Sequence, residues 1–170
     1  LKPETKNIGY ASFMLNKNLE KIYLSKNLEK ISERAFIDMK NIREIEVDIQ
    51  NNFFTSKNGV LYDLNVEKLI YYPQNKNDTI FVVPMTINNI GSYAFSYSSL
   101  KEIILSNNIR IIGEGTFYAA KNINNLILPE NLEFVESNSF AFCDSLKRIK
   151  SLNINPPYTM IVTKINVTKT

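Results

Sequence analysis

The chain has 170 residues, of which 44% are hydrophobic and 22% are charged. This composition suffices for one domain with a buried core and excludes an intrinsically disordered chain. The net charge is +3, from 20 basic and 17 acidic residues. Because the two signs are mixed along the sequence, it lacks the concentrated basic face that nucleic-acid binding requires, and we expect no nucleic-acid partner.

The residue types also limit the chemistry of the chain. It has no histidine and one cysteine, Cys143, which excludes Ser-His and Cys-His catalysis and the usual zinc sites. No pair of carboxylates lies in a context that suggests a pocket, so we expect no enzymatic activity, metal or cofactor. No apolar run approaches the roughly 20 residues that span a bilayer, and we therefore expect no membrane insertion.

A unit of 23 residues, complete at 19–41, repeats along the chain. It aligns five phenylalanines with spacings of 23, 59, 22 and 23 residues: Phe13, Phe36, Phe95, Phe117 and Phe140. A period in the twenties is typical of a leucine-rich repeat solenoid, in which each unit buries its apolar face against its neighbours. We expect one domain, with a partial repeat at 1–18 and repeats at 19–48 and 78–157. Because the chain begins inside a partial repeat, we expect the natural protein to continue upstream.

Each unit begins with a predicted strand. Ile22 and Leu24 alternate with polar neighbours, which indicates a strand with one buried face. Stacking the units then gives a parallel concave sheet of about six strands. Ser32 favours a short helical turn that carries Ala35 and Phe36 inward. The predicted fold is therefore mostly β, with short helical turns.

The interval 49–77 breaks the repeat. Asn58-Gly59 is a hairpin-turn dipeptide between two β-rich runs, and a third run ends at Pro73. We expect an inserted antiparallel β-meander at the edge of the solenoid, with backbone hydrogen bonds mostly its own and aromatic rings packed on the coil. After Pro156-Pro157, the tail 158–170 is compatible with either a terminal strand or a frayed end.

These residues resemble the BspA-like leucine-rich repeats, whose pattern is I-x-x-I-G-x-x-A-F-x-x-C-x-x-L. Ile87 to Phe95 matches its first half and Phe140 to Leu146 its second, with Cys143 at a position that is often a buried cysteine. The segments 58–62 and 69–73 resemble the G-V-L-Y and L-I-x-Y-P insertion of that family. The resemblance implies a secreted or cell-surface protein, often tied to adhesion and host contact. It implies no particular ligand.

The outward positions of the predicted strands supply the candidate binding residues. In register they place four residues in one apolar patch: Ile80, Val82, Ile104 and Ile127. An acidic rim of Glu44, Glu46 and Asp48 borders it on one side, and a basic rim of Arg148 and Lys150 on the other. Two interpretations stay open. The apolar patch is either a protein-binding site or a set of ordinary strand residues, because β-branched residues favour strands and a flanking segment or the tail at 161–167 is able to cover them. The full set of candidates is Tyr23, Glu44, Glu46, Ile80, Val82, Glu102, Ile104, Asn125, Ile127, Arg148 and Lys150.

Two functions are compatible with this sequence. The first is a non-enzymatic module of a surface or secreted protein that binds an extracellular or host protein, or a glycan, through the concave sheet. The second is a structural spacer that displays other domains and has no ligand of its own. The sequence leaves the oligomeric state open.

Overall fold

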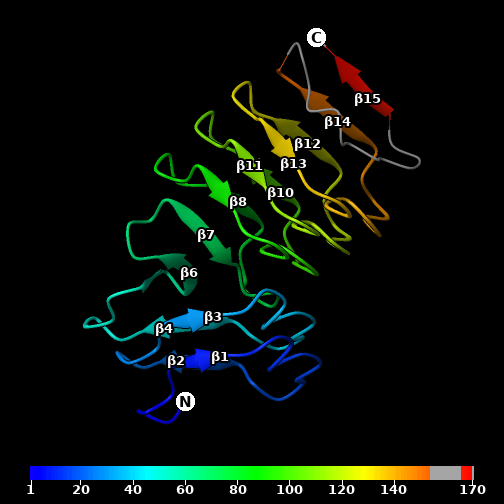
Figure 1. Ribbon diagram of the computed structural model, residues 1–170. Helices are drawn as coiled ribbons and strands as arrows, with labels where there is room; N and C mark the ends of the chain where they lie inside the picture. The colour runs from blue at the N-terminus through cyan, green and yellow to red at the C-terminus, as the bar shows by residue number, and fades with distance from the viewer. Residues whose placement is uncertain (154–165, 170) are drawn as a thin grey trace.

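The chain forms a solenoid of stacked coils with its two ends at opposite ends of the stack (Figure 1). The computed structural model describes residues 1–153 and the backbone of residues 166–169. We number five coils by their aligned phenylalanines, Phe13, Phe36, Phe95, Phe117 and Phe140. Pro156, Pro157 and the first residues of the tail, 158–165, lie outside the described residues.

The predicted strands of the repeats form one row of parallel strands, which we call the strand row. Three hydrogen-bonded groups make up this row: β2 with β4, β8 with β10, and β12 with β14 and β15. The strands are β2 (Lys21–Leu24), β4 (Glu44–Val47), β8 (Ile80–Val82), β10 (Glu102–Ile104), β12 (Asn125–Leu128), β14 (Arg148–Ser151) and β15 (Asn166–Lys169). The parallel arrangement is confirmed, and β15 gives the tail a terminal strand.

A second row of two-residue strands lies on the return path of each coil. These strands are β1 (Asn7–Ile8), β3 (Lys30–Ile31), β9 (Asn89–Ile90), β11 (Ile111–Ile112) and β13 (Phe134–Val135). They pair in parallel, β1 with β3, and β11 with β9 on one side and β13 on the other. The outward and return strands thus close each coil around its apolar side chains.

The interval 49–77 forms the predicted antiparallel meander of β5 (Phe54–Lys57), β6 (Val60–Asp63) and β7 (Lys68–Tyr71). Its expected place at the edge of the solenoid is wrong. The strand β7 pairs in parallel with β9, and the Gly59 carbonyl accepts a hydrogen bond from the Ile45 N–H of β4. The meander therefore connects the second coil to the third from within the stack, because β7 extends the ladder of return strands at β9 and the hairpin bonds to β4.

The aromatic ladder predicted from the repeat runs through the core. Phe117 is buried and stacks on Phe95 and Phe140, with ring centroids 5.7 and 5.5 Å apart. Phe13 stacks on Phe36 in the same way. The meander bridges the two stacks, since Tyr71 packs on Phe36 and Tyr72 packs on Phe95. Its aromatic residues therefore anchor it to the coils, as predicted, although Phe53 is exposed.

The expected helical turns are wrong: the described residues contain no helix. Each phenylalanine instead lies between two residues with positive φ, such as Tyr93 (58°) and Tyr97 (57°) around Phe95. This backbone directs the N–H groups of all three residues to carbonyl oxygens of the fourth coil, at 2.8 Å in each case. A helix would use such N–H groups for hydrogen bonds within its own turn. Hydrogen bonding between coils therefore favours residues with positive φ, the left-handed conformation, over a helix at this position.

The ladder gives a prediction for stability. Replacing Phe117 with Ala should lower the free energy of unfolding by about 3–5 kcal/mol, because the cavity lies between two rings that cannot close on it. Phe142→Ala, at an exposed ring of the next coil, is the control and should cost less than about 1 kcal/mol. Urea unfolding of both variants measures the difference. Equal losses would contradict a ladder that holds the coils together.

Cys143 lies in the core of the fifth coil, as expected from its place in the repeat. Its Sγ donates a hydrogen bond to the Phe117 carbonyl oxygen. Burial raises the pKa of the thiol to about 11, which disfavours the reactive thiolate.

We therefore expect Cys143 to react with a disulfide reagent at pH 8 about 100-fold more slowly in the folded than in the unfolded chain, since its thiolate is depleted. The absorbance change on reaction, followed with and without denaturant, measures this ratio. Raising the pH should increase the folded rate up to the raised pKa. Rapid reaction of the folded protein at pH 8 would show that this part of the core is open.

Candidate binding surfaces

The candidate residues occupy the outward positions of the strand row in the expected register. Tyr23 lies opposite Glu46, Val82 opposite Ile104, and Ile127 opposite Lys150. The other set of positions pairs Lys21 with Glu44, Ile80 with Glu102, and Asn125 with Arg148. The residues between them, such as Ile22, Ile103 and Ile149, are buried. All eleven candidates therefore belong to the same face of the coils.

Four apolar side chains of this face are exposed to solvent. The exposed fractions are 51% for Ile80, 61% for Val82, 45% for Ile104 and 54% for Ile127. These side chains come from β8, β10 and β12, which follow one another in the stack (Figure 1). We call these four residues the apolar patch.

The two charged rims differ in how they meet the apolar patch. Arg148 and Lys150 on β14 lie directly beside Asn125 and Ile127, so the basic rim borders the patch. The acidic rim does not, because no Cα atom of β4 lies within 8 Å of one in β8. The hairpin of the meander separates them, with Gly59 packed against Glu44. The expected continuous surface of about six strands is thus divided at the insertion.

Lys21 on β2 partly compensates the two negative charges of Glu44 and Glu46 on β4. The ammonium group of Lys21 lies 2.6 Å from Glu46 and 3.3 Å from Glu44. The Gln50 N–H and the Tyr23 hydroxyl both donate to the Asp48 carboxylate and lower its pKa. These side chains are committed to contacts within the chain, so the N-terminal strands present a weaker acidic surface than the sequence suggests.

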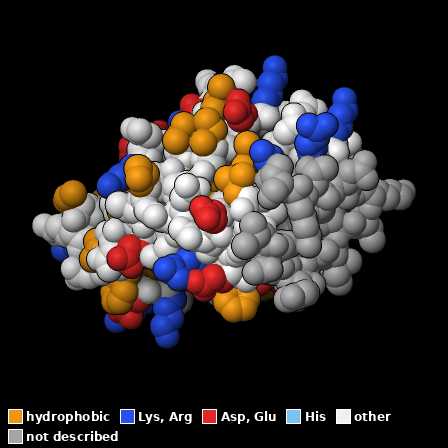
Figure 2. All heavy atoms as spheres, turned by 90° about the horizontal axis from the view of Figure 1, so that it is seen from above, with side chains coloured by type: hydrophobic (Ala, Val, Ile, Leu, Met, Phe, Trp, Pro, Cys, Tyr) orange, Lys and Arg blue, Asp and Glu red, His pale blue; other side chains and the backbone are white. Residues whose placement is uncertain are grey.

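In Figure 2 the exposed hydrophobic side chains form small groups separated by charged and neutral atoms. Large exposed apolar residues also occur outside the strand row, including Met14, Phe134 and Phe142. Exposure alone therefore does not distinguish the apolar patch. Its distinguishing property is that an apolar residue occupies the same outward position on successive strands.

A groove of about 230 Å³, absent from the sequence predictions, lies where the insertion interrupts the stack. One wall is residues 31–37 of the second coil, and the other combines residues of the meander with residues 91–93 of the third coil. Phe36, Phe54, Ile70 and Tyr71 contribute apolar lining. The only sequence signal for this groove is the 59-residue spacing between Phe36 and Phe95, which marks the interruption but not its shape.

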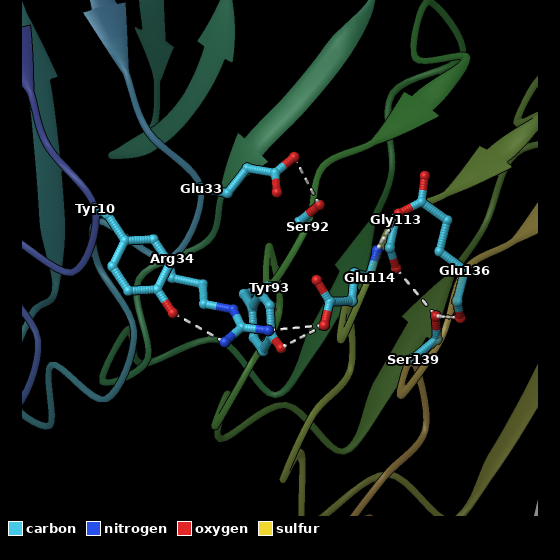
Figure 3. A network of polar contacts seen from close by, with 9 residues as sticks. All are labelled: Tyr10, Glu33, Arg34, Ser92, Tyr93, Gly113, Glu114, Glu136 and Ser139. Atoms are coloured by element: carbon cyan, nitrogen blue, oxygen red, sulfur yellow. Dashed lines mark hydrogen bonds and ion pairs between the residues drawn. The ribbon is translucent and has the colours of Figure 1, made fainter.

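Polar side chains tie the coils together across this groove (Figure 3). The guanidinium of Arg34 lies over the Tyr93 ring at 4.5 Å, and its Nη2 lies 2.7 Å from Glu114 Oε1. Its Nη1 donates to the Tyr10 hydroxyl at 3.0 Å. Beside it, Ser92 Oγ donates to Glu33 at 3.2 Å. Arg34 therefore connects four successive coils, and no local pattern predicted partners so distant in sequence.

The partners of Arg34 are themselves held by the next coils (Figure 3). The Glu114 N–H donates to Glu136 Oε2 at 3.0 Å, while Ser139 Oγ donates to the Gly113 carbonyl oxygen at 3.0 Å. Burial and the hydrogen bond to Glu114 raise the pKa of Tyr93 to about 12, so its hydroxyl remains a donor at neutral pH. The network therefore fixes the relative positions of the coils beside the groove.

The described part of the chain contains no cluster of three or more potential metal ligands. None of its elements is a helix long and apolar enough to cross a membrane. The side chains of Glu33, Arg34 and Ser92 beside the groove have hydrogen-bond or ion-pair partners, and the strand row is an open surface.

Comparisons with known proteins agree on the repeat. A family profile described as BspA type leucine rich repeat region matches six copies over residues 1–67 and 71–162. No curated protein matches the chain significantly.

Solved structures of bacterial repeat proteins share the fold. A leucine-rich repeat protein from Eubacterium ventriosum ATCC 27560 is 29% identical, with a TM-score of 0.84 over 88% of this chain and 40% of its own. The pneumococcal vaccine antigen PcpA is 23% identical, with a TM-score of 0.73 over 98% of this chain and 55% of its own.

A leucine rich cell surface protein from Faecalibacterium prausnitzii A2-165 is 20% identical, with a TM-score of 0.61 over 82% of this chain and 43% of its own. The chain thus spans about half or less of the length of these three structures. The family profile covers most of the sequence, and the coils, the ladder and the insertion follow its pattern. The chain therefore belongs to the BspA type leucine-rich repeat family.

Proposed function

We propose that the chain is a non-enzymatic binding module of a surface or secreted protein, which recognises a protein or glycan partner through the strand row. The observation that carries the proposal is the apolar patch on three successive strands, where a sheet face open to water normally bears polar side chains. A contiguous exposed apolar area often marks an interaction site. Adhesion is the role that this surface supports best.

The charge beside the patch supports the same role. Arg148 and Lys150 border Ile127 directly, while the acidic residues of β4 lie beyond the meander and are paired with Lys21. A partner that contacts the apolar patch therefore meets positive charge on one side. Such an arrangement favours partners with acidic groups next to an apolar surface and orients them along the strand row.

Two further observations support a place outside the cell. The chain belongs to the BspA type family, and the structure from Faecalibacterium prausnitzii with the same fold is described as a cell surface protein. A rigid repeat array displayed at a surface presents a wide face without the need for an enclosed pocket.

The test replaces Val82, Ile104 and Ile127 together with Lys. We expect this variant to lose binding to the extracellular-matrix proteins or glycans that the parent binds, because three charges would enter a desolvated contact. Its melting temperature should stay within about 3 °C of the parent, since all three side chains point to solvent. Surface plasmon resonance against a panel of such ligands measures binding, and circular dichroism measures folding.

A matched control carries Lys at three exposed apolar positions outside the strand row, Met14, Phe134 and Phe142. It should bind as the parent does. Equal loss of binding in both variants would argue against a specific patch. A parent that binds no ligand on the panel would favour the spacer function.

A further inference from the structure

The second coil has an open backbone edge where it faces the groove. In the third coil, the N–H groups of Tyr93 and Phe95 donate to carbonyl oxygens of the next coil at 2.8 Å. The fourth coil repeats both bonds from Gly115 and Phe117. The equivalent donors of the second coil are the N–H groups of Arg34 and Phe36. Within the described residues, neither of them donates a hydrogen bond.

The same edge also presents unused acceptors. In the first coil, the carbonyl oxygens of Lys6 and Ile8 accept N–H groups of the second coil. In the third coil, Asn88 and Ile90 accept N–H groups of the fourth. The corresponding carbonyls of the second coil belong to Glu29 and Ile31, and no N–H group of the described chain donates to either of them.

The insertion explains why this edge stays open. The Tyr72 N–H takes the position that Phe36 would occupy in a regular stack and donates to the Ala94 carbonyl at 2.8 Å. The strand β7 likewise supplies the carbonyls that β9 requires. The backbone of the third coil is therefore paired with the meander, whereas the return side of the second coil, from Glu29 to Phe36, is left without a backbone partner toward the groove.

The gap between β3 and the meander is wider than the spacing of two paired strands. No Cα atom of β3 lies within 8 Å of one in β5, β6 or β7. Two strands on either side of a missing one would be about 9.6 Å apart, twice the usual strand spacing. The groove of about 230 Å³ lies between the same residues.

The chemistry of the edge identifies its ligand class. Carbonyl acceptors at Glu29 and Ile31 followed by N–H donors at Arg34 and Phe36 complement a peptide main chain, which offers both groups, better than an anion or a sugar. Phe36 is only 3% exposed, so its unpaired N–H has a strong need for a partner. The charged side chains of the lining balance, with Arg34 and Lys68 against Glu33 and Asp63.

We propose that this edge binds an extended peptide segment of a partner protein. The segment pairs in parallel with β3 as an additional strand and places an apolar side chain over Phe36 and Ile70. This site lies on the return side of the coils and is independent of the apolar patch.

The probe is a synthetic peptide with the sequence of residues 87–95, capped at both ends. In the third coil this segment places N–H groups at Asn88, Asn89 and Gly91 toward the preceding neighbour. It therefore carries the main-chain pattern that the open edge lacks. A second peptide with N-methylglycine in place of Gly91 lacks one of these donors and should bind at least about tenfold more weakly.

Amide hydrogen exchange tests the edge directly. In the free protein, the Phe36 amide should exchange faster than the amides of Phe95 and Phe117, which are hydrogen-bonded in the stack. Addition of the parent peptide should protect Arg34 and Phe36 and leave the other two unchanged. A Phe36 amide as protected as Phe117 in the free protein would overturn the proposal, as would an absence of peptide-induced protection.

A variant that fills the groove provides the second measurement. Ile70→Trp, at a half-buried lining position, should abolish binding of the peptide, whereas Ile111→Trp, at a half-buried position on β11, should not. The chain has no tryptophan of its own, so the fluorescence of each variant reports on its folding. The triple Lys variant of the apolar patch should bind the peptide normally. Peptide binding that survives Ile70→Trp would place the contact elsewhere and contradict this site.

Discussion

The structure depends on the backbone hydrogen bonds that each coil exchanges with the next. The N–H groups around each phenylalanine point along the stack, so a coil cannot satisfy them alone. The left-handed residues on both sides of the ring make this direction possible. The rings then stack because the backbones above and below them are already in register. Main-chain pairing and the ladder are therefore two results of one constraint.

The insertion shows how the chain meets this constraint where the repeat fails. Tyr71 and Tyr72 continue the aromatic ladder, and β7 continues the ladder of return strands. The meander pairs fully on the side of the third coil but not on the side of the second. The Arg34 network spans the remaining gap and holds the two parts of the stack together. The same asymmetry that leaves the groove also divides the strand row.

This division gives the molecule two distinct surfaces. The strand row beyond the meander is apolar with a basic border, whereas the strands before it carry paired charges. The groove lies on the return side, where its recognition groups are backbone atoms. A broad apolar face and a narrow main-chain edge suit different partners. The repeat architecture permits both because each coil contributes only a few residues to either surface.

The sequence by itself determined the repeat, the inward strand residues, the phenylalanine ladder and the register of the outward positions, because these follow from a periodic pattern of apolar residues. It also identified the meander from Asn58-Gly59 and its flanking runs. Only the tertiary structure decided the turn conformation, the place of the meander, the separation of Glu44 and Glu46 from Val82, and the groove beside Arg34. Those features depend on which backbone edges remain unpaired and on contacts between residues as distant as Arg34 and Glu114, neither of which a local pattern encodes.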